Sequence, residues 1–265
     1  MGVVHLVGGQ KGGSGKTFFA RILCHYFHAH KLAVQILDAD PQQDLYRVYG
    51  GIGGIQFWGG DADAAAYSKS SNEMDILYDL AVEHPLVLVN LPGNAQEGLA
   101  WWLTANRLLE SELQDIEFRY WYLCNSLQGL EAFNQSLAFF AGKLAHCLVL
   151  NQFGAPDWDY AQFSQIKHIS LPVLHRTEAQ LFNDPSHPLT YGDALKVGML
   201  PRLAQKRLFD FLSVVFADLE VTGWLDKPNL PVPVPTSRVK KRNSNSQTAE
   251  VDLVEEVGNG SRNQT

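Results

Sequence analysis

A run of glycines with two lysines and a threonine near the start of the chain has the residue types that hold phosphate. The run is Gly8-Gly9-Gln10-Lys11-Gly12-Gly13-Ser14-Gly15-Lys16-Thr17. Glycines let backbone N–H groups turn inward around an anion without a clash from Cβ. The ammonium of Lys16 can reach phosphate oxygens, and the hydroxyl of Thr17 can ligate Mg²⁺. We therefore expect a phosphate-binding loop; the alternative is a glycine-rich turn that binds nothing.

The segments on either side of this run predict the strand and the helix that such a loop needs. Residues 3–7 are mostly apolar and predict a buried strand. Residues 16 to about 30 have a helical pattern. A helix that starts at the end of the loop directs its first N–H groups and the positive end of its dipole at the anion. The order strand, loop, helix is the context that makes the motif specific.

Two carboxylates follow the next predicted strand, residues 33–37. They are Asp38 and Asp40, in the segment Asp-Ala-Asp-Pro-Gln. Parallel α/β sheets bind ligands at the carboxyl ends of their strands. Because strand residues alternate between faces, Asp38 and Asp40 lie on the same side. The alternative is that the two carboxylates cap the helix that follows.

Two further strands are predicted to end in asparagine. Residues 86–89 and residues 146–150 are apolar runs, followed by Asn90 and Asn151. An amide accepts hydrogen bonds but carries no charge, so Asn90 assists a cation less than a carboxylate would. Asparagine after a strand is also an ordinary turn residue. Residues 50–54, rich in glycine, predict a flexible turn rather than a second phosphate loop.

The segment from Lys11 to Thr17 resembles the deviant Walker A motif of the ParA/MinD superfamily of dimerising ATPases. The Asp-x-Asp-Pro-Gln segment resembles the one that follows the second strand of ParA-like proteins. The resemblance covers residues 1 to about 222. It implies an α/β fold with a mostly parallel, doubly wound sheet and helices on both faces. It also implies ATP and Mg²⁺ as cofactors, with these nucleotide contacts in the loop: Gly12, Gly13, Ser14, Gly15, Lys16 and Thr17.

The resemblance assigns catalytic roles to Lys11, Lys16 and Asp40. By this resemblance, Lys11 of each subunit crosses to the nucleotide of the other in an ATP-bound homodimer. Lys16 contacts the β- and γ-phosphates. Asp40 orients or activates the attacking water.

The resemblance also assigns metal and base contacts. Thr17 and Asp38 are the expected Mg²⁺ contacts, Asp38 through a bound water, and Asn151 is expected to bond the adenine ring. The family usually has a Walker B aspartate where this chain has Asn90. We therefore expect ATP binding to be retained and hydrolysis to be slow.

Apolar residues at helical spacing between positions 199 and 222 predict a closing helix. Arg202, Lys206 and Arg207 lie on its early turns. ParA-like ATPases use basic residues near this end to hold the DNA backbone non-specifically. The alternative is a solvated helix face, which the acidic residues further along favour. From residue 227 prolines and then polar residues predict a disordered tail, 227–265, which leaves 1–226 as the ATPase domain.

Composition limits the classes of function. The chain has 265 residues and a net charge of −7, which excludes a globally basic nucleic-acid coat but not a local basic patch. Three widely spaced cysteines form no metal-ligand pattern or disulfide framework, so we expect a cytoplasmic protein, nucleoid-associated if it binds DNA. No apolar run is long enough to span a membrane, and no membrane partner is expected.

Three functions are open at this point. The first is an ATP-dependent switch that partitions or positions plasmid DNA or another cargo. The second is an accessory ATPase of conjugative mobilisation or plasmid stability that recruits a relaxase complex, with a small adaptor or relaxosome protein as partner. The compact core and Asn90 favour it. The third is a metabolic ligase or kinase, against which Lys11 argues because a monomeric enzyme needs no lysine that acts across a dimer.

Overall fold

A parallel sheet forms the centre of the part that the structure describes. The structure, a computed structural model, describes residues 2–9, 12–55, 64–110 and 116–225, with the side chains of 64–73 left out. Seven strands there lie in the order β3-β2-β4-β1-β5-β6-β7, and every pairing is parallel. They are β1 Gly2–Gly8, β2 Gln35–Asp38, β3 Ile52–Gly53, β4 Leu86–Asn90, β5 Ile116–Cys124, β6 Ala145–Asn151 and β7 His168–Leu171.

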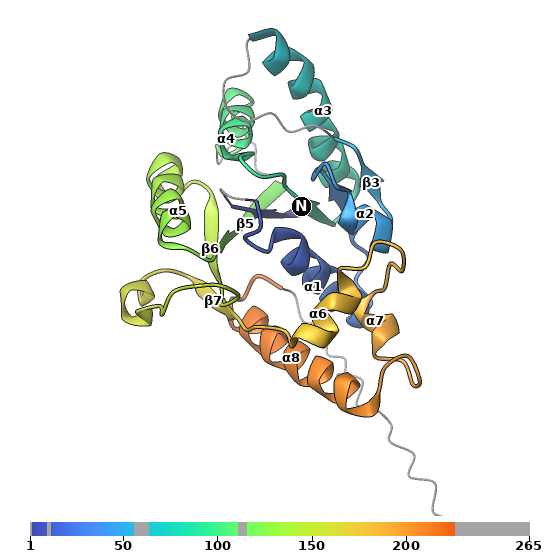
Figure 1. Cartoon of the computed structure of the whole chain (residues 1–265). Coiled ribbons are helices and arrows are strands. Elements are labelled where there is room, and N and C mark those ends of the chain that lie inside the picture. The colour runs from blue at the N-terminus through green and yellow to red at the C-terminus, as the bar shows by residue number, and fades with distance from the viewer. Residues whose placement is uncertain (1, 10–11, 56–63, 111–115, 226–265) are drawn as a thin grey trace, which may run out of the picture. The chain divides into compact units, whose positions relative to one another are not determined.

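Helices cover both faces of this sheet (Figure 1). One face packs against α3 Ala64–Glu83, α4 Gln96–Ala105, α5 Leu127–Phe140 and the 3₁₀ turn η2 Tyr160–Phe163. The other packs against α1 Lys16–Ala29, α2 Asp44–Tyr49, α6 Arg176–Phe182, α7 Tyr191–Ala194 and α8 Arg202–Val221. Because both faces are covered, the central strands are apolar on both sides rather than alternating. The predicted fold class is confirmed.

Strand residues divide between the two cores by the alternation of the pleat. Leu6 of β1 and Val89 of β4 belong to the core under α3, α4 and α5. Val7 and Leu88 belong to the core under α1 and α8. All of these side chains are fully buried. The three cysteines are buried and free, as expected for small core residues.

Some local expectations were wrong, and others lie outside the described residues. Residues 50–54 are not only a turn, because Ile52–Gly53 pairs with β2 as the edge strand β3. A two-residue strand is too short to show a periodicity in the sequence. Lys11 and the tail from residue 227 lie outside the described residues. Within the described part, no helix combines the length and apolar character needed to cross a membrane.

Candidate functional site

The loop between β1 and α1 has the shape that an anion site needs. Gly13 and Gly15 adopt φ values of +80° and +98°, in the left-handed region that a Cβ disfavours. A Cβ added to Gly12 or Gly13 would meet no atom within 4 Å, so the space in front of the loop is open. The helix α1 begins at Lys16, directly after this turn. Backbone N–H groups and the helix N-terminus therefore face the same open space.

Two buried side chains in the loop fit a bound phosphate. Lys16 is only 5% exposed, and burial lowers the pKa of its ammonium, an effect that the nearby charge of Asp40 opposes. The hydroxyl oxygen of Ser14 is buried without a hydrogen-bond partner in the described part of the chain. A buried polar atom with no partner is costly, and a phosphate oxygen would satisfy it.

Asn90 joins the loop to the carboxylate at the end of β2. Asp38 and Asn90 are paired in register on the neighbouring strands β2 and β4. The amide nitrogen of Asn90 donates to Oδ1 of Asp38 at 2.9 Å and to Oγ1 of Thr17 at 3.3 Å. Burial raises the pKa of Asp38, against the hydrogen bonds from Tyr46, Asn90 and Asp40. Thr17 and Asp38, the two residues expected to contact Mg²⁺, therefore both accept a hydrogen bond from the side-chain amide of Asn90.

The donors at this point suit a magnesium ion held together with phosphate. The hydroxyl of Thr17 and the carboxylate of Asp38 are oxygen ligands of the kind Mg²⁺ prefers. Oδ1 of Asn90 is buried and has no hydrogen-bond partner among the described residues. No group of three His, Cys, Asp or Glu side chains in that same part of the chain could hold a metal ion. An ion here would therefore also need phosphate oxygens and waters.

Asp40 is more exposed than Asp38 and has a different set of contacts. Its Oδ1 accepts a hydrogen bond from the N–H of Gln42 at 3.0 Å, and its own N–H donates to Asp38 at 3.2 Å. Oδ2 of Asp38 accepts from the N–H of Tyr46 at 2.9 Å, in the first turn of α2. Asp38 therefore satisfies an N–H group in the first turn of α2, as the helix-capping alternative expects, while the metal and catalytic roles of the pair remain predictions.

Two asparagines, one directly after β5 and one at the end of β6, donate hydrogen bonds to the backbone of the phosphate loop. Nδ2 of Asn151 donates to the carbonyl of Ser14 at 2.9 Å, and a Cβ at Gly15 would collide with this amide. Nδ2 of Asn125 lies 3.4 Å from the carbonyl of Gly13. Asn125 was missed, although the rule that selected Asn151, an asparagine after a buried strand, also applies to it. The adenine contact of Asn151 remains a prediction.

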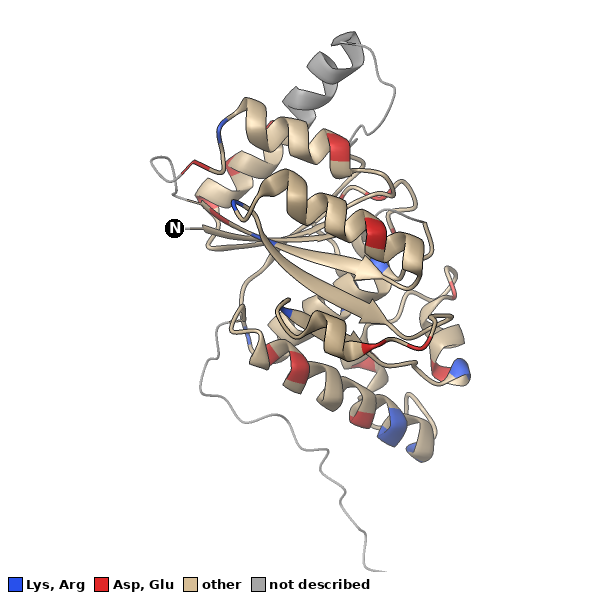
Figure 2. Cartoon of the chain, turned by 90° about the vertical axis from the view of Figure 1, so that its left-hand side faces the viewer, with Lys and Arg blue, Asp and Glu red and all other residues tan. Residues whose placement is uncertain are grey.

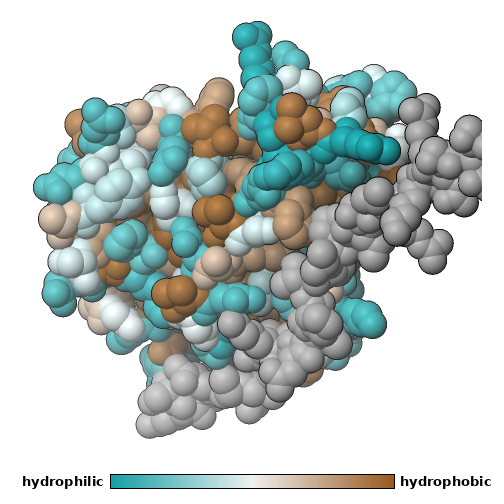
Figure 3. Space-filling model, turned by 90° about the horizontal axis from the view of Figure 1, so that it is seen from below, coloured by the Kyte–Doolittle hydropathy of each residue, from teal (hydrophilic) through white to brown (hydrophobic). Residues whose placement is uncertain are grey.

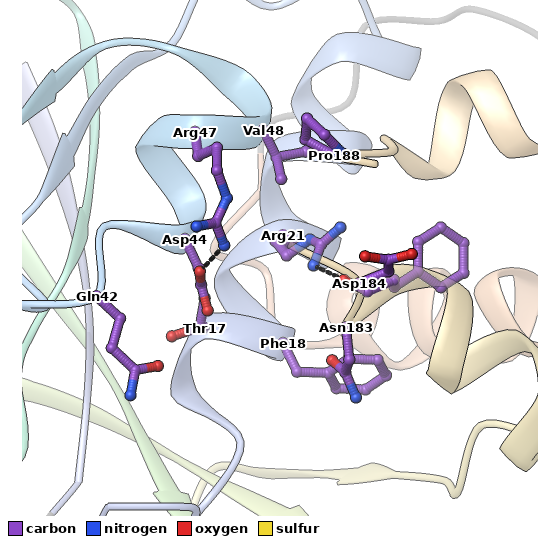
Figure 4. A pocket seen from close by; sticks show the side chains of 11 residues that line it. Thr17, Phe18, Arg21, Gln42, Asp44, Arg47, Val48, Asn183, Asp184 and Pro188 are labelled. Atoms are coloured by element: carbon purple, nitrogen blue, oxygen red, sulfur yellow. Dashed lines mark hydrogen bonds and ion pairs between the residues drawn. The ribbon is translucent and has the colours of Figure 1, made fainter. Parts of the chain in front are cut away.

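A cavity of about 290 Å³ lies beside Thr17 (Figure 4). Its lining comes from α1, α2 and the segment after α6. Arg21 donates to the carbonyls of Phe182 and Leu189, at 2.5 and 2.8 Å, and ties α1 to that segment. Arg47 forms an ion pair with Asp44; both residues belong to α2, which lines one side of the cavity. Arg21, Arg47 and Asp44 therefore all have partners within the chain, although Nε of Arg21 is buried with none among the described residues, and they indicate no particular ligand.

The cations of the predicted DNA patch do gather at the start of α8, but two of the three have carboxylate partners. Figure 2 shows blue ribbon segments, which mark Lys and Arg, near one end of this helix and red segments, which mark Asp and Glu, along the rest. Arg207 pairs with the fully buried Glu178, and Lys206 pairs with Asp210. No ion pair of Arg202 is found among the described residues. DNA binding by these residues remains a prediction.

Comparison with known proteins agrees with this fold. The family model of the CobQ/CobB/MinD/ParA nucleotide binding domain matches residues 6–223. The cell division ATPase MinD of Pyrococcus furiosus is 14% identical with a TM-score of 0.51, over 82% of this chain and 99% of that one. A McdA variant of Cyanothece in complex with ATP is 13% identical with a TM-score of 0.50, over 85% and 98%. A search of curated proteins found no match.

Proposed function

The chain belongs to the CobQ/CobB/MinD/ParA nucleotide-binding family, and we propose that it is an ATP-dependent, dimerising ATPase switch. In this proposal it partitions or positions DNA or another cargo and hydrolyses ATP slowly. The observation that carries the proposal is the pair of orphaned buried oxygens, Ser14 Oγ and Asn90 Oδ1, around the loop at the start of α1. The ATP bound to the similar McdA variant supports the choice of nucleotide.

In this proposal, some residues of the site bind the nucleotide and the metal, and others act in hydrolysis. Loop N–H groups, Lys16 and the hydroxyl of Ser14 hold the phosphates. Thr17 and Asp38 hold Mg²⁺, which when bound supplies positive charge against the phosphate oxygens. Asp40, the more exposed carboxylate, orients the attacking water. Each of these steps stabilises charge or position, which is most of what phosphoryl transfer requires.

Asn90 is the reason to expect slow turnover. Its amide stands in register with Asp38, at the position where the family usually has an aspartate. It orders Asp38 and Thr17 through two hydrogen bonds without adding a negative charge near the metal. Binding therefore keeps its geometry, while part of the charge that would hold Mg²⁺ is missing. A slow hydrolase remains in its ATP state for longer, which suits a switch.

The dimer is tested through Lys11, which lies outside the described residues. We expect Lys11→Ala to bind ATP as the wild type does but to lose hydrolysis or ATP-dependent dimerisation. Cations that act across an interface in this way contribute roughly 10³–10⁵ in rate. Turnover is followed by phosphate release and binding by calorimetry. If Lys11→Ala hydrolyses ATP as fast as the wild type and has the same molar mass in solution with Mg-ATP, the dimer is removed from the proposal.

A second candidate has support from two observations. Asn90 weakens the case for efficient hydrolysis, and the internal ion pairs of Arg207 and Lys206 weaken the case for a DNA-binding patch. Both suit an accessory ATPase of conjugative mobilisation that recruits a relaxase complex through protein contacts with an adaptor or relaxosome protein. DNA retention that falls steeply with salt would favour the partition switch, while retention of a partner protein alone would favour the accessory ATPase.

A further inference from the structure

The strand β7 ends the sheet on one side and is longer than the strand that ends it on the other. The strand order places β3, of two residues, at one edge and β7, of four residues, at the opposite edge. Very short edge strands are one means by which proteins prevent further strands from pairing. Within the described part of the chain, β7 pairs with β6 alone. The outer edge of β7 is therefore where this sheet could accept another strand.

The outer edge of β7 presents backbone groups in a regular pattern. The carbonyls of Lys167 and Leu171 point toward β6, where they accept hydrogen bonds from N–H groups at 2.9 and 3.0 Å. Because the backbone groups of a strand alternate in direction, the N–H and C=O groups of His168 and Ser170 point away from β6. None of these four groups has a hydrogen-bond partner among the residues that the structure describes. They form a short row of unpaired donors and acceptors.

A groove of about 220 Å³ lies beside this edge. Its lining comes from β7, from η2 and from α8, which packs beside β7 (Figure 1). Tyr160 lines the groove from η2, and Asp218 and Val221 line it from α8. Asp218 is the one carboxylate of this lining, and no ion pair of Asp218 is found in the described part of the chain. The groove thus combines unpaired backbone groups with apolar surface and one negative charge.

We propose that the outer edge of β7 is a docking site for a partner protein, which adds an extended, basic segment to the sheet as a further strand. Donors and acceptors in alternation are matched by another extended backbone, and strand addition of this kind is a recurring mode of peptide recognition. Tyr160 and Val221 contact apolar side chains of the added segment, and Asp218 faces a lysine or an arginine. The net charge of −7 also favours a basic partner. The inference goes beyond the proposed function, because the groove contains no residue of the nucleotide site.

A second copy of this chain is a poorer occupant of the same edge. Pairing β7 with the β7 of another copy would bring two Asp218 carboxylates to one interface. Like charges placed together across an interface oppose binding, whereas a basic segment complements the carboxylate. The charge of the groove therefore favours a different protein over a symmetric dimer.

The test is a fluorescence anisotropy titration of a labelled peptide with the full chain, in the absence of nucleotide. The probe is the peptide Lys-Val-Thr-Val-Lys-Val-Thr, which has the alternation of a strand and carries lysines. We expect a Kd of about 10–100 µM. The same peptide with every backbone amide N-methylated cannot donate to the edge and should bind at least about tenfold more weakly. A peptide with glutamate in place of lysine should also bind more weakly, because Asp218 repels it.

Ser170→Pro removes one outward N–H group from β7 without removing a hydrogen bond to β6. This variant should raise the Kd of the lysine peptide at least about tenfold. Ser170→Ala is the matched control, since it keeps the N–H group and loses only the hydroxyl, which accepts from Gln152 at 2.7 Å. It should leave the Kd unchanged. If urea unfolding shows that Ser170→Pro does not fold, His168→Pro removes the other outward N–H group at the first residue of β7, where proline is tolerated.

Asp218→Asn tests the charge of the groove. It should raise the Kd of the lysine peptide about three- to fivefold, because the lysine loses its carboxylate partner. Asp210→Asn, on the same helix but outside the groove, is the control and should leave the Kd unchanged.

Three results would overturn the inference and leave the proposed function standing, because the titration contains no nucleotide. The first is a folded Ser170→Pro variant that binds the peptide like the wild type. The second is equal binding of the N-methylated peptide, or no binding of the lysine peptide up to about 1 mM. The third is a wild-type dimer without nucleotide or peptide that Ser170→Pro abolishes, which would assign the edge to a second copy.

Discussion

The starts of α1 and α8 both carry cations, yet the structure treats the two sets differently. At α1, Lys16 is buried within a loop where a hydroxyl oxygen of Ser14 and an amide oxygen of Asn90 have no partner among the described residues. At α8, Arg207 and Lys206 are paired with carboxylates of the same chain. The first arrangement leaves two buried oxygens without a partner among the described residues, whereas the second already pairs Arg207 and Lys206 with carboxylates. Sequence shows where cations are, but the contacts show which of them have a carboxylate partner.

The surface around α8 agrees with this contrast. Leu203, Val214 and Val221 are exposed on the helix, between charged residues. On the face seen from below, apolar side chains are mixed with hydrophilic ones (Figure 3). Exposed apolar residues among charged ones are ordinary for a protein surface. We therefore place the stronger evidence for ligand binding at α1.

The largest effect should come from removing the loop lysine. Lys16→Ala takes away a charged hydrogen-bond donor, so the Kd of Mg-ATP should rise by about 100-fold or more. Calorimetric titration measures it. Lys206→Ala is the control at α8 and should leave the Kd unchanged. If both variants bind ATP like the wild type, the contrast between the two helix starts has no functional meaning.

The next effect concerns the amide beside Asp38. Asn90→Asp replaces a donor to Asp38 with a second carboxylate, so the free energy of unfolding without nucleotide should fall by about 1–3 kcal/mol. With Mg-ATP the added charge has a cation to hold, and turnover should rise about tenfold. Urea unfolding and phosphate release measure the two quantities.

Asn94→Asp is the control for this change, because Asn94 is exposed in the loop after the same strand. It should alter neither quantity. A turnover that stays the same in Asn90→Asp would mean that Asp38 already supplies what the metal needs. If nucleotide-free Asn90→Asp has the same free energy of unfolding as the wild type, the role given to the hydrogen bond between Asn90 and Asp38 is contradicted.

Smaller effects are expected at α8, and they separate structure from DNA binding. Arg207→Ala leaves the buried carboxylate of Glu178 without its strongest partner and should cost about 1–3 kcal/mol of unfolding free energy. Lys206→Ala breaks an exposed pair and should cost less than about 0.5 kcal/mol. If α8 holds DNA, Lys206→Ala should also lower the salt dependence of binding by about one unit of slope. Equal stability of the two variants would contradict the assigned contacts.

The pH dependence of the same pair has a defined direction. Burial opposes ionisation of Glu178, but hydrogen bonds from Arg207 and His175 outweigh it and hold the pKa of Glu178 below its usual 4.5. A lowered folded pKa gives stability that is full above pH 4.5 and is lost as the pH falls through the folded value. Urea unfolding between pH 6 and pH 3 should therefore show a smaller acid loss in Arg207→Ala than in the wild type.

The sequence predicted which residues of the candidate site lie together, because the site follows strand ends. Thr17, Asp38 and Asn90 come from three separate segments, and the rule that ligands bind at the carboxyl ends of parallel strands was enough to place them together. The two orphaned oxygens could not be predicted, because partners depend on side-chain geometry. The edge strand Ile52–Gly53 was missed because two residues carry no periodicity.

The predicted DNA patch shows what the sequence could not predict, namely which of its cations pair with carboxylates. Arg207 and Glu178 are 29 positions apart in the sequence and lie on different helices, α8 and α6. Helical spacing brings together residues three or four positions apart, such as Lys206 and Asp210, but it says nothing of a pair at this separation. The packing of α6 against α8 decides that Arg207 neutralises a buried carboxylate.

The most direct test is the molar mass in solution of the wild type and of Asp40→Ala, each with and without Mg-ATP. We expect monomers without nucleotide and an Asp40→Ala dimer with Mg-ATP, because the proposed function gives Asp40 a role in hydrolysis and not in binding. The wild type should pass through the same dimer and return as ATP is consumed. If both proteins stay monomeric with Mg-ATP while turning over ATP on a small substrate, the switch is contradicted and a metabolic enzyme takes its place.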